Sequence, residues 1–317
     1  MEILELFQKV FNALPGAVSM GLIWGIMAIG LYITYRILDV ADLTVDGSFA
    51  TGGAVCVMAL LNGCNVWVAF LLAFLSGMLA GAVTGFLHTF MGIPAILSGI
   101  LTQLSLYSIN LKIMGKSNQS VNVNQTDVLV SLRWVKEAII NNPLIMVSII
   151  IIVLIAALYW FFGTEMGCAI RATGANINMS RAQGINTGFN KFIGIMLSNG
   201  IVAASGALLA QYNGFADINM GRGAIVIGLA AIIIGEAIFS KIFKNFALRL
   251  LGAAIGAVIY YIVVQSVVAL GMDAELLKLL SAVVVAIFLA VPFWKKKISE
   301  KRIGTVKSNK KEVNDNA

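Results

Sequence analysis

The chain has 317 residues, of which 59% are apolar and only 12% are charged, and its mean hydropathy is +0.92. A soluble domain normally carries about a quarter charged residues, so this composition excludes a water-soluble enzyme and indicates an integral membrane protein. The formal net charge of +7 is concentrated in residues 295–317, which hold eight Lys or Arg and three Asp or Glu. Because the excess charge belongs to one tail, we expect no nucleic-acid partner.

Nine apolar stretches are long enough to form helices that cross a membrane, which takes about 20 residues for roughly 30 Å of hydrocarbon. The predicted spans are 17–35, 44–61, 66–87, 94–114, 144–162, 189–211, 222–239, 247–270 and 275–294. The second is Gly-rich and opens with a polar run, so a re-entrant or broken helix is an alternative there. We predict an all-α polytopic bundle of about eight to ten transmembrane helices. The transmembrane domain covers 1–294, and a disordered cytoplasmic tail covers 295–317.

Lys and Arg in short loops predict the orientation of the bundle. The basic tail that begins at Lys295 places the C-terminus in the cytoplasm. The basic loops at 163–190 and 240–249 then also lie inside, and the polar loops at 115–143 and 271–275 lie outside. With nine spans, the N-terminus is outside.

Motifs for catalysis, metal binding and ATP binding are missing from the sequence. The three cysteines have no C-x-x-C spacing, and a single histidine, His88, cannot build a His-based metal centre. Residues 110–117 nearly match a phosphate-binding loop but lack its first glycine. We therefore expect no metal site, no cofactor bound by this chain and no enzymatic activity of its own.

Charged residues are sparse inside the spans. No Asp, Glu, Lys or Arg lies near the middle of a confident span, and Glu236, the nearest, is interpreted as an interfacial carboxylate. This counts against an ion-coupled secondary transporter, which is kept as the alternative function. Asp39, Asp42 and Asp46 cluster near one predicted membrane face, and we favour capping and loop hydrogen bonding as their role.

Neutral polar residues do lie within the spans. Gln103, Tyr107 and Asn110 share one helical face because they recur at i, i+4 and i+7. Three further candidates for buried hydrogen bonding are Asn199, Tyr261 and Gln265. Helix–helix hydrogen bonding is the favoured interpretation of this set, and a translocation path for a polar solute is the alternative.

Two rows of glycines are spaced for close packing of helices. Gly77, Gly81 and Gly85 form one row, and Gly252 with Gly256 forms the other. Small residues four apart let helix backbones approach closely. These rows predict tight packing and imply no chemistry.

The predicted inner loop at 163–191 is too polar for a span and too long for a simple turn. The run from Arg171 to Ala182 suggests a short helix on the membrane surface, with glycines that permit tight exits at either end. Such a helix can dock a cytoplasmic partner, although composition alone favours a merely basic loop.

The spacing of this loop resembles a known signature. Gly167-x-x-x-Arg171-Ala172-x-Gly174-x-Asn176, followed by Ala182-x-Gly184-Ile185, resembles the cytoplasmic loop of ABC-importer permeases of the branched-chain amino acid and ribose type. Stretches 199–208 and 228–235 are similar to the helices that follow it in that family, except that Glu236 replaces a second glycine. Segment 36–48 resembles a subgroup of uncharacterised permeases often associated with aromatic amino acid uptake. The resemblance covers about residues 17–294.

The resemblance implies a permease subunit that moves a small polar solute, an amino acid, inward across the bacterial cytoplasmic membrane. Two permease copies would form the pathway as a homodimer surrounded by membrane lipid, each resting its 163–188 loop on a cytoplasmic ABC ATPase. ATP and Mg would be bound by that ATPase, and an extracellular or periplasmic solute-binding protein would deliver the solute. Arg171 and Arg181 would meet acidic patches on the ATPase. The implied coupling residues are Gly167, Arg171, Gly174, Asn176, Arg181, Ala182, Gly184 and Ile185.

Overall fold

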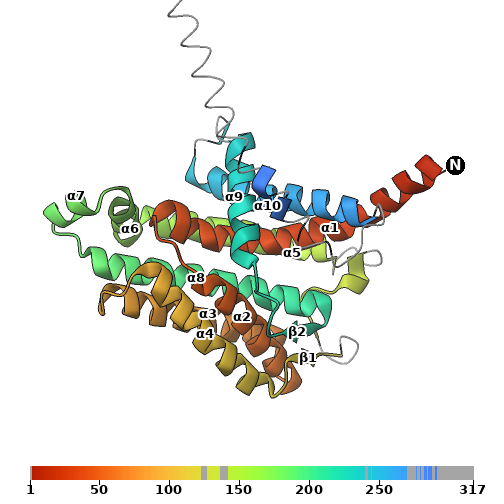
Figure 1. The fold of residues 1–317 in the computed structure, drawn as a ribbon, viewed down its shortest axis with the longest axis horizontal. Coiled ribbons are helices and arrows are strands. Elements are labelled where there is room, and N and C mark those ends of the chain that lie inside the picture. The colour runs from red at the N-terminus through yellow and green to blue at the C-terminus, as the bar shows by residue number, and fades with distance from the viewer. Residues whose placement is uncertain are drawn as a thin grey trace, which may run out of the picture.

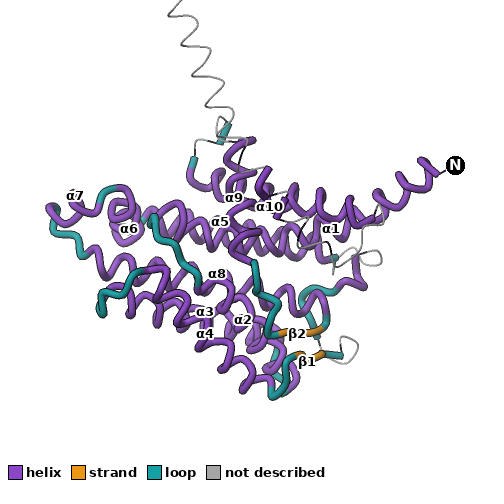
Figure 2. Tube along the Cα trace, in the orientation of Figure 1, coloured by secondary structure: helices purple, strands orange, loops and turns teal. Residues whose placement is uncertain are grey.

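The computed structural model describes residues 2–269, apart from 123–126, 136–141, 240–241 and 244, together with scattered positions between 276 and 290. Within these residues the chain is almost entirely helical (Figure 2). The α-helices are α1 (Glu2–Tyr32), α2 (Thr44–Leu61), α3 (Val66–Thr89), α4 (Ala95–Met114), α5 (Pro143–Gly163), α6 (Glu165–Ala175), α7 (Ile177–Ala182), α8 (Thr187–Asn213), α9 (Ala224–Phe239) and α10 (Phe246–Ala269). The other elements are a π-helix (Ile33–Ile37), a 3-10 helix (Leu132–Val135) and the strands β1 (Asn118–Ser120) and β2 (Phe215–Asp217).

Eight of the nine predicted spans coincide with helices. Six helices are long and apolar enough to cross a membrane: α1, α2, α3, α5, α8 and α10. The predicted spans at 94–114 and 222–239 correspond to the less apolar α4 and to the shorter, 16-residue α9. The ninth span falls mostly outside the described residues, as does the whole tail at 295–317. The prediction of an all-α polytopic membrane protein is confirmed.

Helix α8 runs through the centre of the bundle and packs against α1, α2 and α3 (Figure 1). On one side of it lie α2, α3 and α4, and on the other side α1 packs against α9 and α10. Most of the side chains in the apolar stretches of α1 and α8 are buried, whereas few of those in α5 are. Because apolar side chains need no protein cover in lipid, the bare surface of α5 is a lipid-facing surface.

The predicted glycine row on α3 packs against α8. A side chain at Gly81 would come within 2.7 Å of the Ile195 carbonyl oxygen, and one at Gly85 within 3.2 Å of the Phe192 Cα. Gly77 faces the backbone of Asn199 in the same way. The second row, Gly252 with Gly256, packs α10 against α9, where Gly256 meets the backbone of Ala231. Both rows therefore serve close helix packing, as predicted.

The two ends of the bundle differ. Helices α6 and α7 lie at one end, which we call the α6 end, and the antiparallel strands β1 and β2 lie at the other, the sheet end (Figure 1). Asn118 pairs with Asp217 in this small sheet. Asn245 and Arg249 line a pocket together with Arg171, so the two loops predicted to share the inner side do lie at one end.

Helix α2 begins inside the bundle. After the π-helix that ends α1, residues 38–43 run without regular structure, and Asp39 has a positive φ of 54°. Asp42 then bonds Asn199, which lies at the middle of α8. The alternative of a broken span is therefore half right, because the irregular segment precedes α2 while residues 44–61 form one regular helix.

This position corrects the interpretation of the aspartates. Asp42 does not lie in a surface loop, because it bonds the middle of α8 and is only 2% exposed. The count of charged residues that disfavoured an ion-coupled carrier covered only the confident spans, so it did not include this buried carboxylate. The segment was misplaced because a polar run between two spans has the composition of a surface loop.

Helix α9 also begins inside the bundle. The chain from β2 to α9 runs from the sheet end to the middle of the molecule (Figure 2). There Gly221 packs against the backbone carbonyl of Asp46, and no side chain would fit between them. The starts of α2 and α9 are thus neighbours.

Candidate translocation cavity and coupling surface

A buried polar network fixes the start of α2. Asn199 Nδ2 donates to Asp42 Oδ2 at 2.6 Å, and Ser48 Oγ donates to Asn199 Oδ1 at 2.6 Å. Asp42 Oδ1 accepts from the backbone N–H of Thr44 at 2.9 Å, a local hydrogen bond of the loop kind that the sequence favoured for this aspartate. Thr44 continues the network through Thr84 at 2.7 Å. The contacts of Asn199 therefore favour helix–helix hydrogen bonding over solute contact.

A cavity of about 260 Å³ lies between α2, α4 and the segment that leads into α9. We call it the α4 cavity. Its lining residues are Asp46, Gly47, Ala50, Gln103, Leu104, Tyr107, Asn110, Ile218 and Arg222. The structure thus brings together all three polar residues predicted on the face of α4. They line a space into which a solute can fit.

Asn110 belongs to the wall of this cavity, but its side chain is only 1% exposed. Its Oδ1 atom has no hydrogen-bond partner among the described residues, and a buried carbonyl oxygen without a donor costs about 1–3 kcal/mol. The oxygen is enclosed by protein, so the polar groups at the open surface of the cavity come from other residues.

Two opposite charges complete the α4 cavity. Asp46 accepts from the backbone N–H groups of Gly223 and Ile225 at 3.0 and 2.9 Å, so it caps α9 across the cavity. Arg222, exposed and adjacent, makes no ion pair in the part of the chain that the structure describes. A carboxylate has about four lone-pair sites, so Asp46 can still accept from a ligand.

Sequence reasoning missed the roles of Asp46 and Arg222. The available signal was Gly221-Arg222-Gly223, an arginine between two glycines directly before an apolar stretch. The other predicted path residues lie elsewhere. Tyr261 packs its ring 5.7 Å from that of Trp24, and neither it nor Gln265, also on α10, lines the α4 cavity.

The predicted surface helix at 171–182 is two helices. Helix α6 begins at Glu165, and the chain breaks at Asn176, whose backbone is extended with φ −158°. The Asn176 side chain accepts from the Met179 N–H at 3.0 Å and so starts α7. The expectation of one helix was wrong because an internal cap was not recognised. Gly184, with φ +77°, forms the tight exit that was predicted.

Helix α6 is fastened to two spanning helices. Gly167 packs against the end of α5, and Gly174 packs directly on the backbone carbonyl of Ile37. Gly174 lies inside α6, so it permits close packing and is not an exit from the helix. Arg171 Nη2 donates to the Phe162 carbonyl oxygen at 2.8 Å. A displacement of α6 would therefore disturb its contacts with the ends of α1 and α5.

Helix α7 is the more exposed part of the loop. Met179 is 52% exposed, and Ala182 at its end is exposed too. Arg181 Nε donates to Thr187 Oγ1 at 3.1 Å, and the Ile185 N–H donates to the Ser180 carbonyl at 3.0 Å. The loop therefore presents a defined surface at the α6 end.

Glu236 pairs with Arg36 across α9 and α1. Arg36 Nε lies 2.8 Å from Glu236 Oε1, and the two side chains are 56% and 33% exposed. A partly exposed pair at the α6 end fits the interfacial interpretation of this carboxylate.

Comparison with known families identifies the molecule. A family described as the branched-chain amino acid transport system permease component matches residues 14–291. The chain belongs to this permease family. The resemblance carried by the loop at 167–185 is thereby confirmed. Membership in a family of ABC transporter permeases outweighs the ion-coupled alternative.

Several relatives match the permease over most of its length. A tyrosine transport system permease protein of Clostridioides difficile is 39% identical, covering 88% of this chain and 91% of its own. The protein RP368 of Rickettsia prowazekii is 36% identical, covering 88% of this chain and 97% of its own. The fructose import permease protein FruF of Bifidobacterium longum is 28% identical, covering 78% of this chain and 68% of its own.

Proposed function

We propose that this permease is the membrane-spanning subunit of a bacterial importer that moves an amino acid inward, with ATP hydrolysed by a separate ATPase. Two copies would form the pathway in the cytoplasmic membrane, and a solute-binding protein would deliver the amino acid. Its relationship to a tyrosine transport permease supports this class of solute. The observation that carries the proposal is the α4 cavity, whose wall includes the carboxylate of Asp46 and the arginine Arg222, which has no ion pair among the described residues.

An amino acid complements these two charges. Its ammonium group can donate to Asp46, and its carboxylate can pair with Arg222, whose guanidinium binds carboxylates through two parallel hydrogen bonds. A neutral sugar has no charges to satisfy Asp46 and Arg222. The cavity of about 260 Å³ lies just below the roughly 300–1,000 Å³ of pockets for drug-sized ligands. It therefore suits a solute of the size of one amino acid.

The α6–α7 loop would couple this site to ATP hydrolysis. The exposed α7, with Met179 and Arg181, would rest on the ATPase, and α6 would carry its movement to α1 and α5. ATP can drive transport only if its binding favours one conformation of the bundle over another. The packing of Gly174 on Ile37 supports this route, because it puts α6 in direct backbone contact with the π-helix that ends α1.

Substitution of Arg222 tests the proposed site. We expect Arg222→Gln to lower ATP-driven amino acid uptake into proteoliposomes by about tenfold or more, because a hydrogen bond to a charged group contributes about 1.5–3 kcal/mol. Lys116→Gln removes the same charge just beyond α4 without touching the cavity and should leave uptake unchanged. Equal uptake by both variants would contradict the assignment of the α4 cavity.

A further inference from the structure

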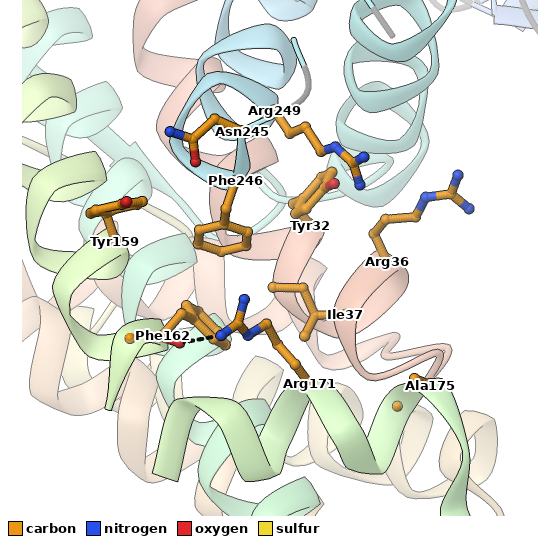
Figure 3. Close-up of a pocket in the computed structure, with 12 residues that line it drawn as sticks. Tyr32, Arg36, Ile37, Tyr159, Phe162, Arg171, Ala175, Asn245, Phe246 and Arg249 are labelled. Carbon is orange, nitrogen blue, oxygen red and sulfur yellow. Dashed lines mark hydrogen bonds between the residues drawn. The ribbon is translucent and has the colours of Figure 1, made fainter. Parts of the chain in front are cut away.

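A second pocket lies at the α6 end, away from the α4 cavity. Its volume is about 750 Å³, and we call it the arginine pocket. The lining residues are Tyr32, Arg36, Ile37, Tyr159, Phe162, Gly163, Arg171, Gly174, Ala175, Asn245, Phe246 and Arg249. Figure 3 shows the side chains of Arg36, Arg171 and Arg249 arranged around Tyr32 and Ile37. Four elements supply the walls: the end of α1 with its π-helix, α5, α6 and the start of α10.

The pocket has an excess of positive charge. Three arginines line it, and no carboxylate does. Only Arg36 has an acidic partner among the described residues, Glu236 at 2.8 Å. Arg171 donates one hydrogen bond to the Phe162 carbonyl oxygen, and its Cζ atom lies 6.0 Å from the centre of the Phe246 ring. Neither contact neutralises its positive charge. A cavity with this lining attracts an anion.

The start of α10 adds to this charge. The Arg249 N–H donates to the Asn245 carbonyl at 3.0 Å, so the first turn of α10 begins at the pocket wall. Free N–H groups and the helix dipole at an N-terminus favour an anion. This contribution reinforces the three guanidinium groups, which by themselves suit a phosphate because each offers a planar fork of donors.

The depth of the pocket matches the headgroup layer of a bilayer. Tyr159 lines the pocket, and the adjacent Trp160, also on α5, is 72% exposed. Exposed aromatic side chains of this kind concentrate at the membrane–water interface. Farther along α5, Ile149, Ile152 and Val153 are exposed apolar side chains. A lipid with its phosphate in the pocket can therefore lay its acyl chains along α5.

The chain's own tail does not suit the pocket. Residues 295–317 carry a net charge of +5, so the arginines repel them. Basic pockets between membrane helices are instead a recurrent setting for the headgroups of anionic lipids.

We propose that the arginine pocket binds a phosphate group, presented by an anionic phospholipid or by a soluble phosphate ester. The phosphate would lie in a pocket whose walls include Arg171 of α6 and Arg249 of α10. It thereby ties the helix that carries the coupling movement to a spanning helix, so occupancy adjusts how freely α6 moves. The inference rests on the charge and shape of the pocket, and it does not depend on the transported solute.

Binding measurements on the purified full-length permease in detergent test this proposal. By native mass spectrometry, we expect phosphatidylglycerol to be retained in preference to phosphatidylcholine. Arg171→Gln and Arg249→Gln should each weaken that retention by about tenfold, the effect of losing one charge-assisted hydrogen bond. Arg249→Lys, which keeps the charge, should retain part of the binding. Arg181→Gln is the matched control, because it removes an arginine at the same end outside the pocket.

A second arm separates the two sources of phosphate. Inorganic pyrophosphate is added to the delipidated protein, and the shift in its melting temperature is compared among the same variants. A shift that needs Arg171 and Arg249, without selective retention of phosphatidylglycerol, assigns the pocket to a soluble phosphate ester. Loss of binding in the two glutamine variants but not in Arg181→Gln supports the site in either arm. If neither probe distinguishes these variants from the wild type, the proposal is overturned.

Discussion

At the scale of single residues, Gly184 forms the turn that fixes the end of α7. Its φ of +77° lies in the left-handed region, where a residue with a side chain costs about 1–2 kcal/mol. The residue closes the turn in which the Ile185 N–H bonds the Ser180 carbonyl. A substitution that strains this turn would therefore destabilise the end of α7, at the proposed contact with the ATPase.

We therefore expect Gly184→Val to reduce solute-stimulated ATP hydrolysis in proteoliposomes that also contain the ATPase. Gly184→Asn is the matched control, because asparagine adopts the left-handed conformation more readily than other residues with side chains, and it should keep most of the activity. Size-exclusion chromatography checks that both variants are folded. Similar stimulation in both would mean that the geometry of this turn does not matter for coupling.

The sequence predicted which residues lie together when all of them belong to one helix. Gln103, Tyr107 and Asn110 could be grouped from their spacing, because they share one face of α4. Asp46 and Arg222 are 176 positions apart, and only the return of the chain after β2 brings them to one cavity. A pattern of neighbouring residues in the sequence cannot predict that these two residues line the same cavity.

At the scale of elements, the start of α9 inside the bundle is the least expected feature. Its first N–H groups lie away from both ends of the molecule, and lipid or apolar protein cannot satisfy them. Asp46 does so from α2, through Gly223 and Ile225. The carboxylate therefore stabilises the helix in addition to its proposed contact with solute.

We expect Asp46→Ala to destabilise the first turn of α9 by about 0.5–2 kcal/mol, the usual effect of losing a cap. Faster hydrogen–deuterium exchange of the amides near Ile225 would show it. Asp217→Ala removes a carboxylate that accepts from Asn219 in the exposed turn after β2, and it should leave α9 unchanged. Unaltered exchange in Asp46→Ala would contradict the capping role.

Hydropathy predicted the helices better than it predicted their depth. Every described span was found, since burial in lipid or protein demands the same apolar composition. The positions of α2 and α9 were not, because residues 38–43 and 218–223 are short segments outside the helices, each with a charged residue, that protein contacts hold inside the bundle. The division between α6 and α7 depends on one internal cap, Asn176. The sequence-based prediction of a single helix between glycines did not include this cap.

At the scale of the whole molecule, the proposed solute site and the proposed coupling region lie apart. The α4 cavity faces the segment between α2 and α9, whereas α6 and the arginine pocket lie at the α6 end. Helix α1 connects them, because its π-helix supports Gly174 and the linker that follows it leads to Asp42. Movement of α6 can thus reach the central network through a continuous run of the chain.

The central claim is that this permease imports an amino acid with energy from a separate ATPase. The most direct measurement is uptake of labelled tyrosine and other amino acids into proteoliposomes that hold the permease and the ATPase encoded with it, with the solute-binding protein on the outside. We expect uptake that needs ATP on the ATPase side and that disappears when the ATPase is omitted. Uptake that persists without ATPase or ATP and follows an imposed ion gradient would contradict the central claim.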